Sequence, residues 1–176
     1  TGVPSAERTA SFSGTASQNE VYLVVKPASL GYTDRFMESR FHAEYSTLLL
    51  NRFLANLDQA AWNDVNPPGF KYMGDNSWDR VQGRDGGAKA IAGGKTGLTT
   101  TGQEDLRYGF LTEYSKSSLE NDFNEYAAAL FMGEFGFAEL VRKYPAVRRK
   151  RDLAARFYSA TMKQLDPNAP GTQRRL

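Results

Sequence analysis

The most regular pattern of apolar and polar residues runs from residue 31 to residue 57. Apolar side chains recur there at steps of three and four residues, which is the period of an amphipathic α-helix with a wide buried face. The residues on that face are Phe36, Met37, Phe41, Tyr45, Leu48, Leu49, Phe53 and Leu57. Thr33, followed by Asp34, has the residue types of an N-terminal cap and first turn. The pattern therefore predicts a long central helix with these apolar side chains in the core.

Two further helices are predicted in the second half of the chain. The sequence Ser117-Ser118-Leu119-Glu120 is a capping-box pattern, which starts a helix. Gly133 or Gly136 ends or bends this helix, ahead of Pro145. Its expected buried residues are Phe123, Tyr126, Ala127, Leu130 and Phe131. The last helix covers residues 145–165, and its expected inner side carries Val147, Leu153, Phe157 and Thr161.

The first half of the chain also contains a strand signal and a turn signal. Residues 20–26, EVYLVVK, concentrate β-branched and aromatic side chains and are closed by Pro27, which predicts a strand of a small sheet. Further along, Pro67-Pro68-Gly69 predicts a turn that stops any helix, with Phe70 and Tyr72 as loop anchors.

A glycine-rich loop is predicted over residues 77–102. Its Gly93-Gly94-Lys95-Thr96 sequence is similar to part of a phosphate-binding loop. The GxxxxGK[ST] pattern requires glycine at position 89, however, and the chain has Lys89 there. The pattern therefore disfavours a phosphate-binding loop.

These elements define one domain with two flanking segments. Residues 1–19 are rich in Ser, Thr, Gly and Ala and predict a flexible N-terminal arm. Residues 166–176 predict a polar C-terminal tail. Residues 20–165 are expected to form a single mainly helical α+β domain, with a small N-terminal sheet and the long central helix.

Composition narrows the function classes. The 176 residues suit one domain, and the net charge of +2 is too small to indicate a nucleic-acid surface. The basic run 148–151 is interpreted as a solvated helix face, because no aromatic residues are interleaved with it. The chain has no cysteine, which excludes disulfides and thiolate zinc sites. No apolar run reaches the length of a membrane span. The first residues do not read as a charged-then-apolar leader, so we expect either a cytosolic chain or one whose leader has been removed.

Candidate chemistry lies in the middle of the central helix, at Ala43-Glu44-Tyr45-Ser46-Thr47. In HExxH zinc peptidases two histidines stand four residues apart, so that both imidazoles face one metal ion from one side of a helix. The glutamate after the first histidine is the general base for the metal-bound water. Here the glutamate is present, and both histidines are absent.

Three segments carry a resemblance to a known family. They are FHAEYSTLL at residues 41–49, WNDVNPPGFKY at 62–72 and GFLTEYSKSSLENDFNEY at 109–126. In order and spacing they resemble the HExxH helix, the W-x-x-x-N-P-x-G-F connection and the G-F-x-x-x-Y segment of lethal-factor-like zinc-binding metallopeptidases, which are common in secreted bacterial proteins. In that family a metal-binding glutamate follows the tyrosine by seven residues and opens an E-D-F-A-E helix. The resemblance implies a zincin-like fold.

Carried over position by position, the resemblance places the two histidine ligands at Ala43 and Thr47 and the glutamate ligand at Asn121. It places the general base at Glu44 and the transition-state tyrosine at Tyr114. The three metal positions thus carry residues that bind zinc poorly or not at all, whereas the base and the tyrosine are retained. The E-D-F-A-E motif reads Asn121-Asp122-Phe123-Asn124-Glu125 in this chain.

The loss of zinc ligands changes the expected chemistry of Glu44. Proton transfer from bulk water, with a pKa of about 15.7, to a glutamate of pKa about 4.3 is uphill by roughly 15 kcal/mol. Zinc brings the pKa of bound water to about 7, which reduces that cost to roughly 4 kcal/mol. Glu44 without a metal ion is therefore not a competent base for peptide hydrolysis.

Two interpretations follow. The first is a degenerate, metal-free and catalytically inactive metallopeptidase-like domain without a cofactor. It would be secreted or periplasmic after leader removal and monomeric, and it would bind a peptide, glycan or protein partner but no nucleic acid. The alternative is an active hydrolase with an atypical metal site built from His42, Glu44, Glu120 or Glu125. His42 is the only histidine, and it lies about 100° around the helix from Ala43, so it is expected to point away from the site.

The retained residues allow structural roles as well as functional ones. Glu44 can persist because it forms a hydrogen bond to Tyr114 or Asn121, and Tyr114 can persist as an anchoring aromatic residue. For both, structure and function remain open. Asp122 is interpreted as a structural residue that caps or pairs near the start of its helix.

Overall fold

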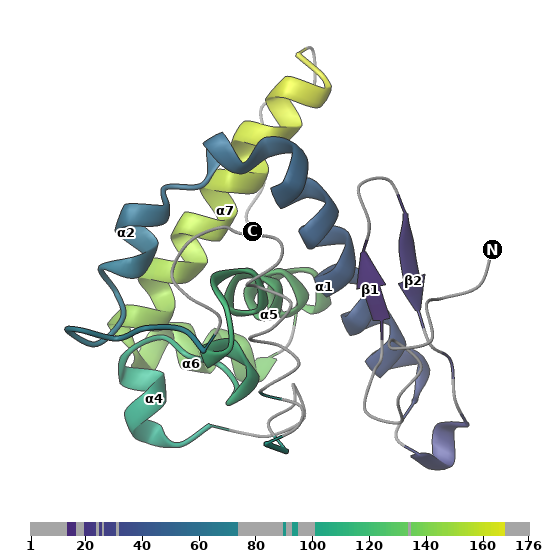
Figure 1. Cartoon of the computed structure of the whole chain (residues 1–176), viewed down its shortest axis with the longest axis horizontal. Helices are drawn as coiled ribbons and strands as arrows, with labels where there is room; N and C mark the ends of the chain where they lie inside the picture. Colours follow the sequence, from purple (N-terminus) through teal and green to yellow (C-terminus); the bar gives the residue numbers. More distant parts are fainter. Residues whose placement is uncertain are drawn as a thin grey trace.

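A computed structural model describes residues 14–16, 20–23, 25, 27–30, 32–73, 90, 93–94, 101–133 and 135–167 of the chain. The described part is mainly helical, with a two-stranded antiparallel sheet near the N-terminus (Figure 1). The expectation of a mainly helical α+β protein is therefore confirmed. The expected C-terminal tail beyond Pro167 and most of the expected glycine-rich loop lie outside the described residues.

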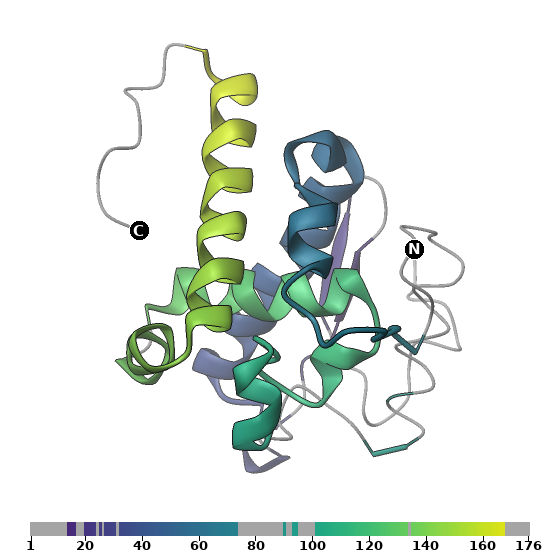
Figure 2. The same cartoon turned by 90° about the vertical axis from the view of Figure 1, so that its left-hand side faces the viewer.

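The described elements follow one another in this order: β1 (Gly14–Ala16), β2 (Val21–Leu23), η2 (Ala28–Leu30), α1 (Asp34–Phe53), η3 (Leu54–Asn56), α2 (Gln59–Asn63), α4 (Gln103–Arg107), η4 (Tyr114–Lys116), α5 (Leu119–Met132), α6 (Phe135–Lys143) and α7 (Pro145–Leu165). Helix α1 contacts the sheet, and it also packs against α5. Helix α7 crosses α5 and contacts α6, α4 and α2 (Figure 2). The core thus lies between α1, α5 and α7.

The sheet corrects one expectation about the N-terminal arm. Gly14 to Ala16 pair antiparallel with Val21 to Leu23, in a register that places Gly14 opposite Leu23 and Ala16 opposite Val21. Small residues that look like a loose arm in the sequence therefore form a strand, because a partner strand completes their backbone hydrogen bonds. The rest of residues 1–19 lies outside the described residues.

Helix α1 begins as predicted, with the Thr33 side chain accepting a hydrogen bond from the Phe36 N–H at 3.2 Å. Its predicted buried face is wrong in part, because Phe41 and Tyr45 are exposed and stack on each other. The side chains buried in their place are smaller or polar, and include Ala43, Ser46, Thr47 and Leu50. The helix turns this side towards α5, because polar partners on α5 satisfy its hydroxyl groups.

Helix α5 begins one residue later than a cap at Ser117 would place it. Its cap is Ser118, whose hydroxyl accepts a hydrogen bond from the Asn121 N–H at 3.0 Å. It ends at Gly133, which has φ +59°, a left-handed conformation that glycine adopts without steric cost. Of the expected buried residues Phe123, Tyr126 and Ala127 are buried, whereas Phe131 is exposed.

Helix α7 matches its predicted bounds, and its expected inner residues Val147, Leu153, Phe157 and Thr161 are all buried. The basic run is not a uniform solvated face, however. Arg148 and Arg149 are exposed, but Lys150 is fully buried. Lys150 lies on the same side of the helix as Val147 and Leu153, because residues three apart share a helix face.

The predicted turn after α2 is present. The Phe70 N–H donates to the Pro67 carbonyl at 2.9 Å, and Gly69 has φ +74°. The Phe70 ring contacts the rings of Tyr72 and Phe110, at centroid distances of 5.0 and 4.8 Å. Phe70 and Tyr72 therefore anchor the loop to the core, as the sequence predicts.

Candidate functional site

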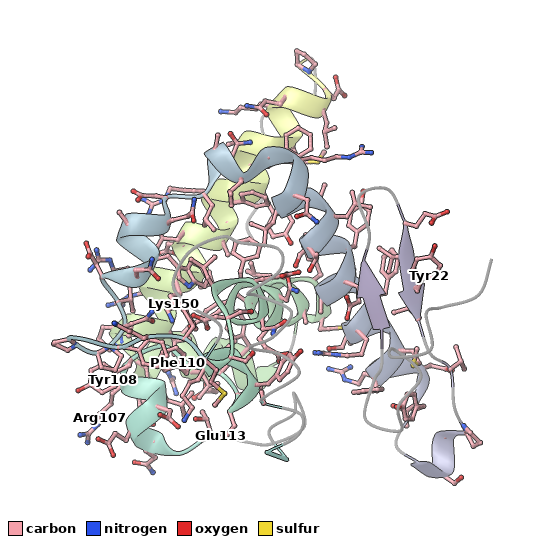
Figure 3. All side chains as sticks on the ribbon, viewed as in Figure 1. Tyr22, Arg107, Tyr108, Phe110, Glu113 and Lys150 are labelled. Carbon is pink, nitrogen blue, oxygen red and sulfur yellow. The ribbon has the colours of Figure 1, made fainter. Side chains whose placement is uncertain are left out.

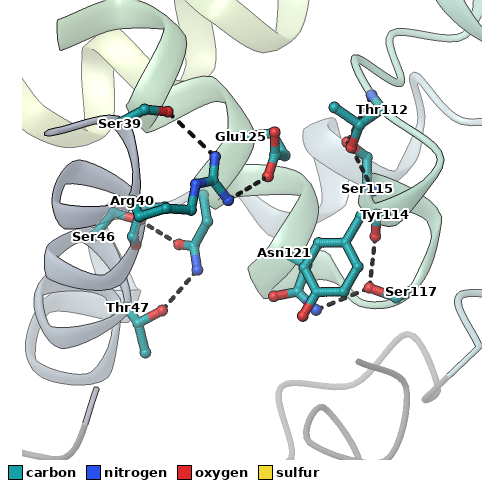
Figure 4. Close-up of polar contacts among 12 residues, drawn as sticks. Ser39, Arg40, Ser46, Thr47, Thr112, Tyr114, Ser115, Ser117, Asn121 and Glu125 are labelled. Carbon is teal, nitrogen blue, oxygen red and sulfur yellow. Dashed lines mark hydrogen bonds and ion pairs between the residues drawn. The ribbon is translucent and has the colours of Figure 1, made fainter. Parts of the chain in front are cut away.

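The residues singled out by the sequence lie on three elements that contact one another. Helix α1 carries Ala43, Glu44 and Thr47, helix α5 carries Asn121, and η4 carries Tyr114. Helix α5 contacts both α1 and η4. Figure 4 shows polar contacts made by residues of these elements, with Arg40 of α1 pointing toward Glu125 of α5. We refer to this region as the α1–α5 crossing.

Thr47 is held by a buried, uncharged hydrogen-bond network. In the amide orientation that satisfies all partners, Asn124 accepts from the Thr47 hydroxyl at 2.7 Å and donates to Ser46 Oγ. The same amide nitrogen lies 3.2 Å from the Ala43 carbonyl, to which Ser46 Oγ also donates at 2.8 Å. The position expected for the second histidine ligand is thus occupied by a hydroxyl group that binds to α5.

Asn121 is also engaged within the protein. Its Nδ2 donates to Ser117 Oγ at 2.8 Å, while Ser117 Oγ contacts the Tyr114 carbonyl at 2.6 Å. These contacts tie the first turn of α5 back to η4. The position expected for the glutamate ligand therefore helps to hold the segment that carries Tyr114.

A cation lies at the other end of the α1–α5 crossing. Arg40 Nη1 and Glu125 Oε1 form an ion pair at 3.0 Å, with side chains that are 12% and 8% exposed. Burial by itself lowers the pKa of Arg40, but the attraction of Glu125, and to a smaller extent that of Glu44, raises it above its ordinary value. Arg40 is therefore a permanent positive charge that joins α1 to α5.

The electrostatics of Tyr114 connect it to the retained glutamate. Burial raises the pKa of the Tyr114 phenol first, and the negative charges of Glu44, Glu120 and Glu125 raise it further. The phenol thus stays protonated at neutral pH and can donate a hydrogen bond. The fold therefore places Glu44, the expected base, close enough to Tyr114 for its charge to act on the phenol.

Comparison of the chain with protein-family models, curated proteins and solved structures found no match.

The residues at the three expected ligand positions do not fit a zinc ion. Ala43 has no donor atom, the Thr47 hydroxyl donates to Asn124, and Asn121 contributes its amide to Ser117. Within the part of the chain that the structure describes, no group of three or more His, Cys, Asp and Glu side chains could hold a metal ion.

His42 points away from these positions, as expected from its place on the helix. Its imidazole stacks on the Phe131 ring of α5 at a centroid distance of 5.0 Å and contacts the Phe41 ring at 5.6 Å. This packing suits a histidine that fills an aromatic contact at the edge of the core.

Asp122 pairs with another residue, as expected, but its partner lies on α7, which the sequence did not predict. It does not cap its own helix but is fully buried against α7, where Lys150 Nζ lies 2.6 Å from Oδ2. Burial raises the pKa of Asp122 and lowers that of Lys150. No spacing in the sequence could have paired them, because the contact joins two separate helices.

Two residues of the α1–α5 crossing were also missed by sequence reasoning: Arg40 and Asn124. Arg40 reads as an ordinary helix-surface cation. Asn124 has one signal in the sequence, because it stands where the family motif E-D-F-A-E has alanine.

No helix in the described part of the chain is long and apolar enough to cross a membrane.

Proposed function

We propose that this chain is a zincin-like domain that has lost its zinc ligands and acts by binding a peptide, glycan or protein partner at the α1–α5 crossing. The proposal rests first on the resemblance of the three sequence segments. It is supported by the contacts that bring the elements carrying Glu44, Tyr114 and Asn121 together.

The observation that carries the proposal is the hydrogen bond between Asn124 and Thr47, at 2.7 Å. Where the family motif has a small alanine, Asn124 extends its amide to the residue at the second histidine position. A buried hydroxyl group needs such a partner, because leaving it unsatisfied costs about 1–3 kcal/mol. Threonine at position 47 and asparagine at position 124 therefore satisfy each other, as expected of a site adapted to the absence of metal.

The alternative of an active hydrolase with an atypical metal site has less support. Glu125, one of its candidate ligands, is neutralised by Arg40. A cation held beside a carboxylate repels a metal ion from the same place. His42, its other distinctive ligand, packs on Phe131.

Metal content tests the proposal directly. The purified protein, with no metal added after lysis, should contain no stoichiometric zinc by elemental analysis. A variant that combines Ala43→His, Thr47→His, Asn121→Glu and Asn124→Ala should bind one zinc ion, because the last change makes room for the imidazole at position 47. The matched control omits Thr47→His and should bind zinc more weakly.

Two outcomes would contradict the proposal. Stoichiometric zinc in the unaltered protein would favour the atypical metal site. A combined variant that retains its helical circular dichroism but binds no zinc would refute the carry-over of ligand positions.

Binding is tested separately on peptide and glycan arrays. A ligand of the α1–α5 crossing should lose affinity in Glu44→Gln and Tyr114→Phe, since both changes remove a polar contact without much change in volume. A ligand that binds both variants unchanged would place the binding surface elsewhere.

A further inference from the structure

A second polar cluster lies on the side of α5 that faces α7. It joins Asp122 of α5 to Lys150 of α7, and both side chains are fully buried. Lys150 Nζ lies 2.6 Å from Asp122 Oδ2. Lysine and aspartate side chains are rarely buried completely. Here their contact holds an amine against a carboxyl group in a place from which bulk water is excluded.

The surroundings of the Lys150 amine are aromatic. Nζ lies 4.2 Å from the centre of the Phe110 ring and 5.4 Å from that of the Trp62 ring. Figure 3 shows Lys150 and Phe110 in this region of the molecule. A Cβ atom at Gly109 would lie 3.2 Å from Lys150 Cδ, so a glycine there leaves room for the lysine stem. The amine is thus confined against one carboxyl group.

The two oxygens of Asp122 have different environments. Oδ2 accepts hydrogen bonds from Trp62 Nε1 at 2.9 Å and from the Tyr72 hydroxyl at 2.7 Å, in addition to its contact with Lys150. Oδ1 is buried and has no hydrogen-bond partner among the described residues. One oxygen is therefore held by two donors that can stabilise negative charge, and the other is free to take up protons and leave.

We propose that Lys150 and Asp122 form an intramolecular isopeptide bond. A proton passes from the Lys150 ammonium group to the Asp122 carboxylate, which gives a neutral amine and a carboxylic acid whose hydroxyl oxygen is Oδ1. The amine nitrogen then attacks Cγ, and the charge that develops on Oδ2 is stabilised by Trp62 and Tyr72. A second proton moves from the nitrogen to Oδ1, the Cγ–Oδ1 bond breaks, and one water molecule leaves. The step needs no oxidant, reductant or co-reactant.

The enclosure favours the reactive form of the pair. Removal from water disfavours charged groups, and accordingly burial lowers the pKa of Lys150 and raises that of Asp122. The neutral amine is the nucleophile, and the protonated acid is the better electrophile. The product amide removes both buried charges.

Intact-mass spectrometry under denaturing conditions tests the bond in the unaltered full chain, after incubation at neutral pH. The mass should be lower than that of the sequence by one water molecule. Trypsin should fail to cleave after Lys150 and should release a branched peptide that contains both Asp122 and Lys150.

The matched control is Lys150→Arg, which keeps a positive charge near Asp122 but removes the amine nucleophile. It should show the full mass. The control matters because Asp85-Gly86 can lose water by forming a succinimide, without any branched peptide.

Each other outcome overturns the proposal. An unaltered protein of full mass with no branched peptide would mean that the pair is only an ion pair. A mass loss that persists in Lys150→Arg would assign the lost water to a succinimide. If Lys150→Arg does not fold, the peptide map of the unaltered protein decides alone.

Discussion

At the scale of single residues, the α1–α5 crossing depends on side chains that satisfy one another. Thr47 and Ser46 are buried hydroxyl residues on a helix face that could have been apolar. Asn124 binds to both and so allows α1 to pack closely on α5. Polar groups buried in this way specify which faces meet, because another alignment would leave them without partners.

We therefore expect Asn124→Ala to lower the free energy of unfolding by about 1–3 kcal/mol, because it removes the buried partner of Thr47 and Ser46. Asn121→Ala is the matched control. Its side chain is half-buried and, among the described residues, donates only to Ser117, so its cost should be about 0.5–1.5 kcal/mol. Urea denaturation of both variants gives the comparison. Equal costs would argue against a special role for the Asn124 network.

At the scale of elements, a single glycine sets where helix α5 ends. Gly133 ends α5 in a left-handed conformation, and α6 begins at Phe135. Gly136 lies inside α6 and has no unusual backbone angle. At both glycines a Cβ atom would meet open space, so only the backbone conformation distinguishes them.

Alanine substitutions at these two positions should therefore have opposite effects. Gly133→Ala should destabilise the protein by about 1 kcal/mol, since an L-residue is strained at φ +59°. Gly136→Ala should stabilise it by up to about 1 kcal/mol, since alanine favours the helix. Thermal unfolding followed by circular dichroism measures both. A stabilising Gly133→Ala would mean that α5 does not end in this conformation.

At the scale of the whole molecule, several buried tyrosines make the free energy of unfolding depend on pH. Burial raises the pKa of Tyr72, Tyr114, Tyr126 and Tyr158 above the ordinary value of 10.0. Below that value both folded and unfolded chains keep these protons. Above it the unfolded chain releases them and the folded chain does not, so the free energy of unfolding falls as pH rises.

Alkaline titration should show this coupling. Part of the tyrosinate absorbance should appear only as the helical circular dichroism is lost, at a pH above about 10. Ionisation of all nine tyrosines before any loss of helix would contradict the described core.

Local signals in the sequence determined much of this protein. The cap at Thr33, the start of α5 to within one residue, its end at one of two nearby glycines and the bounds of α7 follow from residue types at neighbouring positions, where the physical causes act within one turn of a helix. The alternation of apolar residues also located the inner side of α7. These features need no knowledge of distant segments.

The tertiary structure alone decided which polar residues lie inside. Lys150, Asp122, Arg40 and Glu125 look like surface charges, and each is buried only because its partner comes from another helix. Phe41 and Tyr45 show the reverse, because the packing of α1 on α5 leaves them outside. Periodicity measures how apolar a helix face is, whereas burial depends on which partner the face meets, and that partner is distant in the sequence.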